Sequence, residues 1–225
     1  MRTVIVSGGT GGLGVAVTTT LLDAGWRVVV PYNQPRELER LEQHPNLVLV
    51  EADLFEQAAA DTVVANAGSG LAGLVNLVGG FSAGGRVHET EIEDFEEQFR
   101  LNLRPAYLLC RAAIPTMLEH GGGAIVCVST RAAVRPFAGA AGYIASKAAL
   151  LSFVDVLAAE YTDEGLRANA ILPSVIDTPA NRGVQPDEDF SKWVAPEAVA
   201  RVIRFLISED AAPTSGAHIP VYGRA

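Results

Sequence analysis

Tyr143 and Lys147 stand four residues apart at the start of a long apolar segment. On a helix, residues at positions i and i+4 share one face, so the phenol and the ammonium are expected to lie side by side. A lysine cation beside a tyrosine hydroxyl favours the phenolate, which predicts a Tyr143 pKa below the ordinary value of about 10. Tyr143 is therefore a candidate acid and base for proton exchange near neutral pH.

A third reactive group precedes this pair in the sequence. Thr130 follows the apolar run Ala124 to Ser129, which is typical of a buried strand that ends just before the threonine. A hydroxyl, a phenol and an ammonium are then expected to converge. A tyrosine and a lysine at this spacing also occur by coincidence on protein surfaces, so the elements around them decide the interpretation.

A glycine-rich turn near the start of the chain supplies such an element. The strand-like stretch Thr3 to Val6 leads into Ser7-Gly8-Gly9-Thr10-Gly11-Gly12-Leu13-Gly14, and residues 15–24 have helical character. Strand, glycine turn and helix together form a phosphate-binding arrangement. Glycines let the backbone approach a pyrophosphate closely, and the positive end of the helix dipole faces its charge. The alternative is a tight turn without a ligand.

The second predicted strand, residues 26–31, ends at the place where dinucleotide folds hold the adenosine ribose. Tyr32 and Asn33 stand there, instead of an acid for the ribose hydroxyls or a base for the 2′-phosphate. Neither residue decides between NAD and NADP. Arg36 is close enough in sequence to bind a phosphate, and it is also interpretable as a solvated helix residue.

The number of residues between predicted elements identifies the next two strands. Leu47 to Val50 is a third predicted strand, and Asp53 after it is expected to bind an adenine amino group or to cap the next helix. Residues 62–68 and 73–80 compete for the fourth strand. Only the second segment leaves room for a crossover helix after Asp53, so residues 63–67 are predicted to be helical.

Two long helices are predicted in the second half of the chain. Glu91 to Met117 carries Asn102 on a largely apolar stretch, where a polar side chain needs a partner. Tyr143 to Tyr161 is apolar on nearly all sides and should be covered by sheet and partner. Residues 173–186 lack periodicity and are predicted to form a substrate-side loop. The remaining predicted elements are the strand Arg167 to Leu172, the helix Ala195 to Ile207 and the strand Ala217 to Tyr222.

Composition limits the class of protein. The chain has 225 residues, 49% of them apolar and 19% charged, which suits one α/β domain with a large core. A net charge of −9 argues against nucleic acid or a membrane surface as a main partner. No signal peptide, no membrane-spanning run and no metal site are expected. Cys110 and Cys127 are predicted to be buried thiols, which suits the reducing cytoplasm.

The chain resembles the short-chain dehydrogenase/reductase family over essentially its whole length. The family's glycine pattern is matched with serine in place of threonine at the first position, and its Asn-Asn-Ala-Gly motif is matched only partly. Threonine stands where the family usually has its catalytic serine. The positions that carry the resemblance are Ser7 to Gly14, Asn76 to Gly79, Asn102, Thr130, Tyr143, Lys147, and Asn169 to Ser174.

This resemblance implies a fold and an activity. Together with the alternation of strands and helices, it implies that residues 1–225 form one Rossmann-type domain with a doubly wound sheet of seven parallel strands, in the order 3-2-1-4-5-6-7. The implied activity is reversible hydride transfer between NAD or NADP and a carbonyl or alcohol. As in relatives, the long helices around Asn102 and after Tyr143 are expected to form a homodimer or homotetramer interface.

The resemblance also implies site residues. The catalytic residues are Asn102, Thr130, Tyr143 and Lys147. The cofactor-binding residues are Ser7, Gly8, Thr10, Gly12, Leu13, Gly14, Tyr32, Asn33, Asp53, Leu54, Asn76, Val78, Gly79, Tyr143, Lys147, Pro173, Ile176 and Thr178. The substrate is a small molecule whose pocket should lie between residues 80–82, the loop after Val134 and residues 173–193. Phe81 and Trp193 are interpretable as stacking on a flat ring or as lid packing.

Other functions remain open from the sequence. Residues 79–81 and 173–193 resemble dihydropteridine reductases and indicate an imine substrate, although those enzymes generally lack a hydroxyl at the place of Thr130. A non-catalytic dinucleotide-sensing regulator needs the glycine turn but not the four catalytic residues. An epimerase with tightly held NAD normally has a larger substrate region than this chain provides.

Overall fold

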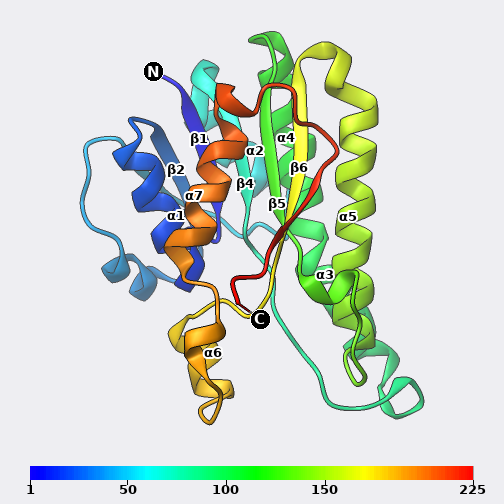
Figure 1. The fold of residues 1–225 in the computed structure, drawn as a ribbon. Helices are drawn as coiled ribbons and strands as arrows, with labels where there is room; N and C mark the ends of the chain where they lie inside the picture. Colours follow the sequence, from blue (N-terminus) through cyan, green and yellow to red (C-terminus); the bar gives the residue numbers. More distant parts are fainter. Residues whose placement is uncertain (225) are drawn as a thin grey trace.

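The computed structural model of the protein describes residues 1–224, and its centre is one parallel sheet with helices on both faces (Figure 1). The lateral order of the seven strands is β3-β2-β1-β4-β5-β6-β7, which confirms the predicted fold class. In chain order the strands are β1 (Thr3–Ser7), β2 (Arg27–Tyr32), β3 (Leu47–Glu51), β4 (Leu71–Asn76), β5 (Gly123–Val128), β6 (Leu166–Pro173) and β7 (His218–Val221).

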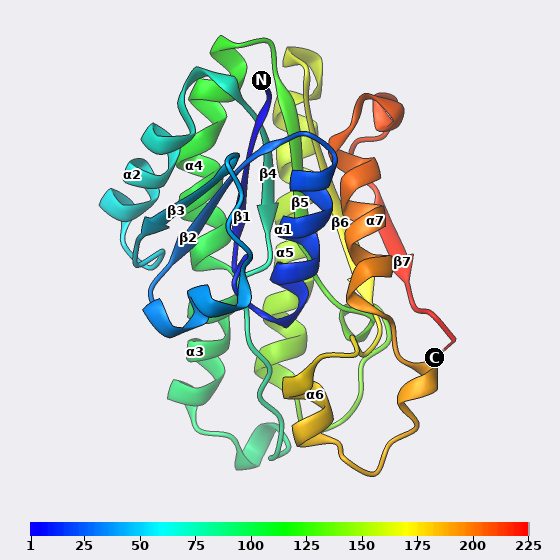
Figure 2. The same cartoon turned by 90° about the vertical axis from the view of Figure 1, so that its left-hand side faces the viewer.

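Within residues 1–224, seven α-helices connect these strands. They are α1 (Gly12–Asp23), α2 (Gln57–Ala67), α3 (Ile92–Asn102), α4 (Arg104–Glu119), α5 (Ala141–Tyr161), α6 (Pro179–Val184) and α7 (Pro196–Ile207). Helices α1 and α7 pack together on one face of the sheet, and α2, α4 and α5 cover the other face (Figure 2). The choice between the two candidate fourth strands is confirmed, because residues 62–67 lie in α2 and β4 follows them.

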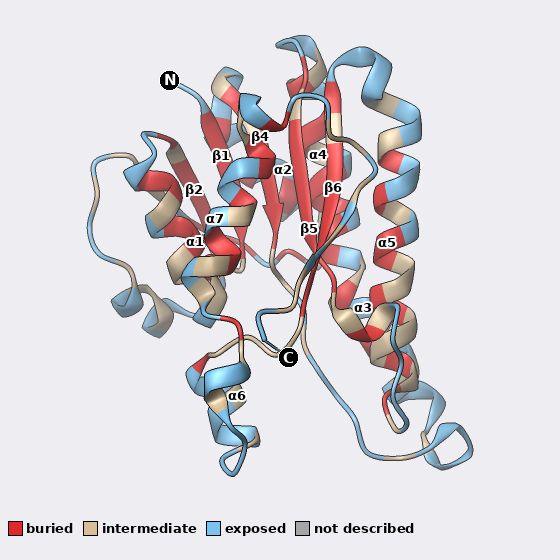
Figure 3. Ribbon diagram, in the orientation of Figure 1, coloured by how far each residue is buried: buried red, intermediate tan, exposed pale blue. Residues whose placement is uncertain are grey.

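The central strands are buried on both faces (Figure 3). In β1, Val4 and Val6 point into the core beneath α1 and α7, whereas Ile5 points into the core on the opposite side. All three side chains are completely buried. A strand covered on both sides carries a continuous apolar run rather than an alternating one, which explains the sequence of β1.

The predicted helix over residues 91–117 is wrong in one respect, because it is two helices. α3 ends at Asn102 and α4 begins at Arg104, with Leu103 between them and Pro105 in the first turn of α4. Proline lacks the backbone N–H that a helix interior requires, but a first turn tolerates it. The break makes Asn102 the last residue of α3.

The segment predicted as a loop over residues 173–186 also differs, because it contains the short helix α6. Thr178 caps this helix by accepting a 3.3 Å hydrogen bond from the backbone N–H of Asn181. Pro179 occupies the first helical position, where its fixed backbone angle fits. Threonine followed by proline is a helix-start signal that the absence of periodicity concealed.

Residues 141–164, which include α5, are long and apolar enough by length and composition alone to cross a membrane. In the fold this helix packs against β6 and α3. A core helix of a globular protein has the same character, and the packing of α5 accounts for its composition.

Candidate active site

Tyr143 and Thr130 lie near each other where β5 ends and α5 begins. Tyr143 lies in the first turn of α5, and the Thr130 side chain is close enough to its phenol to lower the pKa of that phenol. The Thr130 hydroxyl oxygen also accepts a 3.3 Å hydrogen bond from the backbone N–H of Ala132. Its own proton is therefore available to the phenol or to another oxygen. The predicted meeting of the two hydroxyls is confirmed by this geometry.

The predicted lowering of the Tyr143 pKa by Lys147 is wrong. Burial raises the pKa of Tyr143 above its ordinary value, and the nearby Thr130 side chain opposes that rise. The ammonium of Lys147 instead donates a 3.0 Å hydrogen bond to the carbonyl oxygen of Val128. Tyr143 is therefore protonated at neutral pH and suited to give a proton.

Lys147 is held in the protein interior at the end of β5. Its side chain is buried, and burial lowers its pKa from 10.5 to about 8, an effect that the neighbouring Cys127 opposes. The hydroxyl of Ser129 donates a 2.8 Å hydrogen bond to the backbone carbonyl of Lys147, which ties α5 to the strand end. Lys147 is thus a positioned cation that loses its proton more readily than an ordinary lysine.

Asn102 has the partners that a buried polar residue needs. Its Oδ1 accepts a 3.0 Å hydrogen bond from the backbone N–H of Gly80, and its Nδ2 lies 3.2 Å from the hydroxyl oxygen of Ser146. Ser146 in turn donates a 2.8 Å hydrogen bond to the backbone carbonyl of Tyr143. Asn102 therefore connects the segment after β4 to the first turn of α5.

Gly79 keeps Asn102 and Lys147 around one small space. A β-carbon on Gly79 would lie 2.6 Å from Oδ1 of Asn102 and 2.9 Å from Nζ of Lys147. Both distances are too short for a real β-carbon, so any larger side chain displaces one of the two groups. The glycine is required by the site rather than by the local backbone.

The glycine turn brings backbone atoms so close together that larger residues do not fit. Gly8 has a φ of +69°, and a β-carbon on Gly14 would lie 2.0 Å from the carbonyl oxygen of Gly8. A β-carbon on Gly12 would lie 2.9 Å from the Thr178 side chain, so the turn also faces the cap of α6. The hydroxyl oxygen of Ser7 accepts a 3.2 Å hydrogen bond from the backbone N–H of Leu77. The predicted pyrophosphate residues thus meet at the carboxyl ends of the strands.

Other predicted cofactor residues lie at neighbouring strand ends. Asp53 is exposed, and its side chain accepts a 3.0 Å hydrogen bond from the N–H of Phe55. The N-terminal cap of α2 is Glu56, so the alternative that Asp53 caps this helix is wrong. The remaining residues lie at the ends of β2, β3, β4 and β6, namely Tyr32 and Asn33, the buried Leu54, the half-buried Val78, the buried Pro173 and the half-buried Ile176. Leu13 lies within the first turn of α1.

Asn76 is the predicted cofactor residue that faces the core. It is 3% exposed, and its Nδ2 contacts the sulfurs of Cys110 at 3.6 Å and Cys127 at 3.5 Å. Both cysteines are free and buried, as predicted. Burial raises the pKa of each thiol, so both are protonated at neutral pH.

Sequence reasoning missed the contacts of Glu37 and Arg40 with the glycine turn. Glu37 accepts a 2.7 Å hydrogen bond from the Thr10 hydroxyl, and Arg40 donates a 3.2 Å hydrogen bond to the Thr10 carbonyl. Arg36, the residue considered from the sequence, is exposed. The sequence pattern that could have revealed these contacts is an acid and a base three residues apart, Glu37 and Arg40. In the structure both lie in the 3-10 turn Pro35–Arg40.

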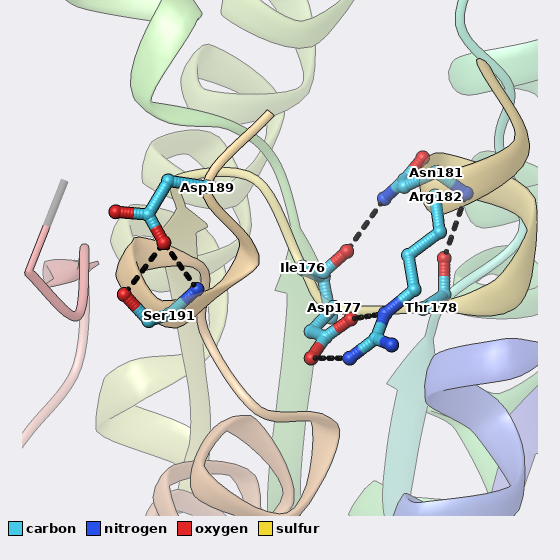
Figure 4. Close-up of polar contacts among 7 residues, drawn as sticks. All are labelled: Ile176, Asp177, Thr178, Asn181, Arg182, Asp189 and Ser191. Carbon is cyan, nitrogen blue, oxygen red and sulfur yellow. Dashed lines mark hydrogen bonds and ion pairs between the residues drawn. The ribbon is translucent and has the colours of Figure 1, made fainter. Parts of the chain in front are cut away.

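The segment after β6 is held by a cluster of polar contacts (Figure 4). Arg182 donates hydrogen bonds of 2.5 and 2.7 Å to the two carboxylate oxygens of Asp177, and its guanidinium lies 4.7 Å from the Phe190 ring centre. Asn181 donates a 2.8 Å hydrogen bond to the carbonyl of Ile176. These contacts fix α6 against the strand end that precedes it.

Phe81 and Trp193, interpreted from the sequence as stacking on a flat ring or as lid packing, belong to different aromatic pairs. Phe81 packs edge-on against Tyr143, with ring centres 5.0 Å apart, whereas Trp193 packs against Phe190 at 4.7 Å. Phe81 also lies 6.5 Å from the Phe137 ring. Phe81 is therefore a neighbour of the phenol, and Trp193 belongs to the segment around α6.

Fold and site together define a dinucleotide-binding α/β oxidoreductase, and comparison with known proteins agrees. A family model described as enoyl-(acyl carrier protein) reductase matches residues 8–223. The 2-(R)-hydroxypropyl-CoM dehydrogenase of Xanthobacter autotrophicus is 32% identical, over 99% of this chain and 97% of that protein. The D-threitol dehydrogenase of Mycolicibacterium smegmatis is 29% identical, over 99% and 92% respectively.

A solved structure extends the similarity. An oxidoreductase of the short-chain dehydrogenase/reductase family from Burkholderia thailandensis superposes with a TM-score of 0.89 at 28% identity, over 99% of this chain and 91% of that one. The chain therefore belongs to the short-chain dehydrogenase/reductase family, as its motifs predicted, and is an NAD(P)-dependent oxidoreductase.

Proposed function

We propose that the protein reduces a carbonyl group, or oxidises the corresponding alcohol, with Asn102, Thr130, Tyr143 and Lys147 as its catalytic residues. The observation that carries this proposal is the proximity of the Thr130 and Tyr143 side chains where β5 ends and α5 begins, with the buried Lys147 one turn further along α5. The nicotinamide cofactor, when bound, supplies or accepts the hydride. Tyr143 gives its proton to the oxygen of the developing alcohol, and Thr130 donates a hydrogen bond to that same oxygen.

Lys147 and Asn102 support the proton transfer in this proposal. Lys147 binds the nicotinamide ribose, and the Val128 carbonyl holds its ammonium in position. A fall of the lysine pKa to about 8 suits a group that passes a proton near neutral pH. Asn102 connects Lys147 to solvent through a water molecule, and the small space beside Gly79 is where the two side chains approach each other.

The glycine turn fits the pyrophosphate of NAD or NADP. A β-carbon at Gly14 would strike the backbone of the turn and one at Gly12 would strike the Thr178 side chain, and the turn opens directly into α1. We assign the pyrophosphate to Ser7, Gly8, Gly12, Leu13, Gly14 and Thr178, and the adenosine to Thr10, Tyr32, Asn33, Asp53 and Leu54. We assign the nicotinamide to Asn76, Val78, Gly79, Pro173 and Ile176. The Asn76 amide faces the two buried thiols, so Asn76 contributes by the position of its strand and not by its side chain.

An alcohol or ketone substrate is better supported than a pterin imine. Two relatives carry names of enzymes that act on alcohols, namely 2-(R)-hydroxypropyl-CoM dehydrogenase and D-threitol dehydrogenase. Thr130 supplies the hydrogen bond that a carbonyl oxygen requires in the transition state. The dihydropteridine reductase and the sensing regulator are therefore not favoured.

We further propose that the chain acts as one domain that assembles into a homodimer or homotetramer in the cytoplasm. A hollow of about 670 Å³ on α3, α4 and α5 has Phe99, Leu103, Tyr107 and Phe153 among its lining residues, together with charged side chains of α3 and α4, namely Glu93, Glu96, Glu97, Arg100 and Arg104. Tyr107 is 51% exposed there, so a second copy is the expected cover. A monomer mass in light scattering at micromolar concentration would remove the assembly from the proposal. The free buried thiols support a reducing compartment.

The decisive test is Tyr143→Phe, which removes the phenol and little else. Oxidation of NADH and NADPH is followed with a panel of ketones and an acetoacetyl thioester. Turnover is expected to fall about 10²–10⁴-fold, the usual worth of a general acid. Cofactor affinity, measured by fluorescence titration, is expected to stay within a small factor of wild type. Unchanged turnover would contradict the proposed mechanism.

A further inference from the structure

Phe55 lies in the turn between β3 and α2, directly after Asp53 and Leu54, which the proposed function assigns to the adenosine. Its backbone N–H donates a 3.0 Å hydrogen bond to Oδ1 of Asp53. This bond holds one carboxylate oxygen, and because Asp53 is exposed, its second oxygen is accessible to a ligand. The orientation of the carboxylate therefore depends on where the backbone of Phe55 lies.

Two arginines hold Phe55 in place. Nε of Arg104 donates a 2.8 Å hydrogen bond to the carbonyl oxygen of Phe55, and the guanidinium of Arg100 lies 4.5 Å from the centre of the Phe55 ring. A cation at this distance is attracted to the face of an aromatic ring. The N–H, the ring and the carbonyl of this half-buried residue are thus all in contact with other groups, which fixes the turn that carries Asp53.

The break between α3 and α4 brings the two arginines to Phe55. Arg100 lies in the last turn of α3, and Arg104 is the first residue of α4. Asn102 lies between them, and its amide holds the segment after β4 to the first turn of α5. One short segment therefore contacts the catalytic end of α5 through Asn102 and the adenosine turn through the two arginines.

The Asp53 carboxylate has the chemistry to select adenine. A carboxylate accepts hydrogen bonds and donates none, so it binds the amino group of adenine. Hypoxanthine has a carbonyl oxygen in place of that amino group and an N–H on the neighbouring ring nitrogen. A carboxylate that is free to move can turn to this N–H, whereas a fixed carboxylate meets the carbonyl oxygen. Discrimination between the two bases therefore reports how firmly Asp53 is held.

We propose that Arg104 is a positioning residue of the adenosine site, which acts through Phe55 to hold the Asp53 carboxylate in place for the adenine amino group. The inference rests on the proposed function, from which it takes the assignment of Asp53 to the adenosine. In this role Arg104 takes no part in the transfer of the hydride or the proton. Loss of its hydrogen bond is therefore expected to weaken cofactor binding and to leave kcat at saturating cofactor unchanged.

The test compares two variants that differ in one donor. The amide nitrogen of glutamine is as many bonds from the backbone as Nε of arginine, and so is the methyl group of methionine. Arg104→Gln therefore keeps an N–H near the Phe55 carbonyl, whereas Arg104→Met replaces it by an apolar group. Both variants lose the guanidinium charge. The measurement is calorimetric titration, without substrate, of NADH or NADPH, whichever binds more tightly, and of its analogue with hypoxanthine in place of adenine.

Wild type is expected to bind the adenine cofactor about 10-fold more tightly than the hypoxanthine analogue, on the scale of one hydrogen bond to a charged group. This ratio is expected to be kept in Arg104→Gln and to fall to about 2 in Arg104→Met, mainly through weaker binding of the adenine cofactor. Asp53→Ala has no acceptor and sets the lower limit, with an expected ratio of about 1.

Arg111→Met is the matched control on the same helix. Arg111 is exposed, lies further along α4, and donates a 3.0 Å hydrogen bond to the side-chain oxygen of Gln57 at the start of α2. This variant also loses a link between α4 and α2 and is expected to keep the wild-type ratio. A purely structural role for Arg104 would lower the thermal stability of Arg104→Met and leave the ratio unchanged. Arg104→Ala removes the same donor and replaces Arg104→Met if circular dichroism shows that the latter is unfolded.

The outcomes separate this inference from the proposed function. A preference for adenine that persists in Arg104→Met would overturn the role of Arg104. Loss of the preference in Arg104→Gln as well would assign the effect to the guanidinium charge and also overturn it. A wild type without any preference would overturn it through Asp53, whereas ketone reduction that requires Tyr143 would still support the proposed function. Absence of binding of both NADH and NADPH would contradict the inference and the proposed function together.

Discussion

The hydroxyl of Thr10, inside the glycine turn, donates a 2.7 Å hydrogen bond to the carboxylate of Glu37. Arg40 completes the group, because one of its nitrogens lies 3.2 Å from the Thr10 carbonyl oxygen and 3.5 Å from the Glu37 carboxylate. Dinucleotide folds bind the adenosine ribose beside the glycine turn and the end of β2. Glu37 therefore brings a carboxylate to the glycine turn from a position four residues after Asn33, where no acid stands.

This contact predicts a preference for NAD. A carboxylate accepts a hydrogen bond from a ribose hydroxyl and repels a 2′-phosphate, so Glu37→Gln is expected to raise the NADP-to-NAD ratio of kcat/KM by about 10-fold. The neighbouring exposed Glu39→Gln is the matched control and should leave the ratio unchanged. The measurement is initial-rate kinetics with both cofactors. Equal ratios in wild type and Glu37→Gln would exclude this role.

A second prediction concerns Thr130 and the type of substrate. Thr130→Ala removes one donor to the substrate oxygen, so ketone reduction is expected to fall about 10²-fold. Reduction of a quinonoid dihydropterin, which has no such oxygen at the reacting carbon, should change much less. Thr130→Ser keeps the hydroxyl and is the control. Pterin reduction that exceeds ketone reduction in wild type would restore the imine alternative.

A third prediction follows from the pKa of Lys147. Because folding lowers this pKa from 10.5 to about 8, the folded state binds fewer protons than the unfolded state between these pH values. The contribution of Lys147 to the free energy of unfolding therefore rises with pH between about 8 and 10.5. At lower pH the buried cation reduces the free energy of unfolding by at most about 3 kcal/mol.

Lys147→Met is expected to remove this dependence. The variant should lose activity but gain up to about 2–3 kcal/mol in the free energy of unfolding at pH 7, and the gain should shrink toward pH 10. Urea denaturation of wild type and variant at several pH values measures the difference. Parallel pH profiles for the two proteins would show that folding does not perturb the lysine.

A fourth prediction tests the space beside Gly79. Gly79→Ala places a β-carbon against Asn102 and Lys147, so turnover is expected to fall at least about 10-fold, with a loss of stability of about 1–3 kcal/mol from overpacking. Gly183→Ala is the control, because a β-carbon there meets no atom within 4 Å. Turnover and urea denaturation are measured for both variants. A fully active Gly79→Ala would mean that the two side chains do not need this spacing.

The alternation of strands and helices together with the family resemblance predicted the sheet, and spacing along the chain predicted that Thr130 lies near Tyr143. Parallel strands require crossovers, so the distance from Asp53 selected the correct fourth strand. The break at Leu103 was missed because the apolar residues of α3 continue the helical pattern through it, and only Pro105 marks the new helix.

Contacts between distant segments were less accessible from the sequence. The position of a lysine on a helix does not reveal which oxygen its ammonium will reach, and here the Val128 carbonyl holds it. In the same way, Arg40 rather than Arg36 reaches the glycine turn because the 3-10 turn directs its side chain there. Such choices depend on tertiary geometry, which the spacing of residues does not contain.

The central place of β1 has a consequence for how the chain is made. Its neighbour β2 follows soon after it, but β4 covers its other edge only later, and the N–H of Leu77 reaches the Ser7 hydroxyl across 70 residues. At a synthesis rate of about 5–20 residues per second, one edge of β1 stays open for roughly 4–14 seconds. An open apolar strand edge is a template for pairing with other chains. The strand that carries the glycine turn is thus most exposed to aggregation while the ribosome is still completing the sheet around it.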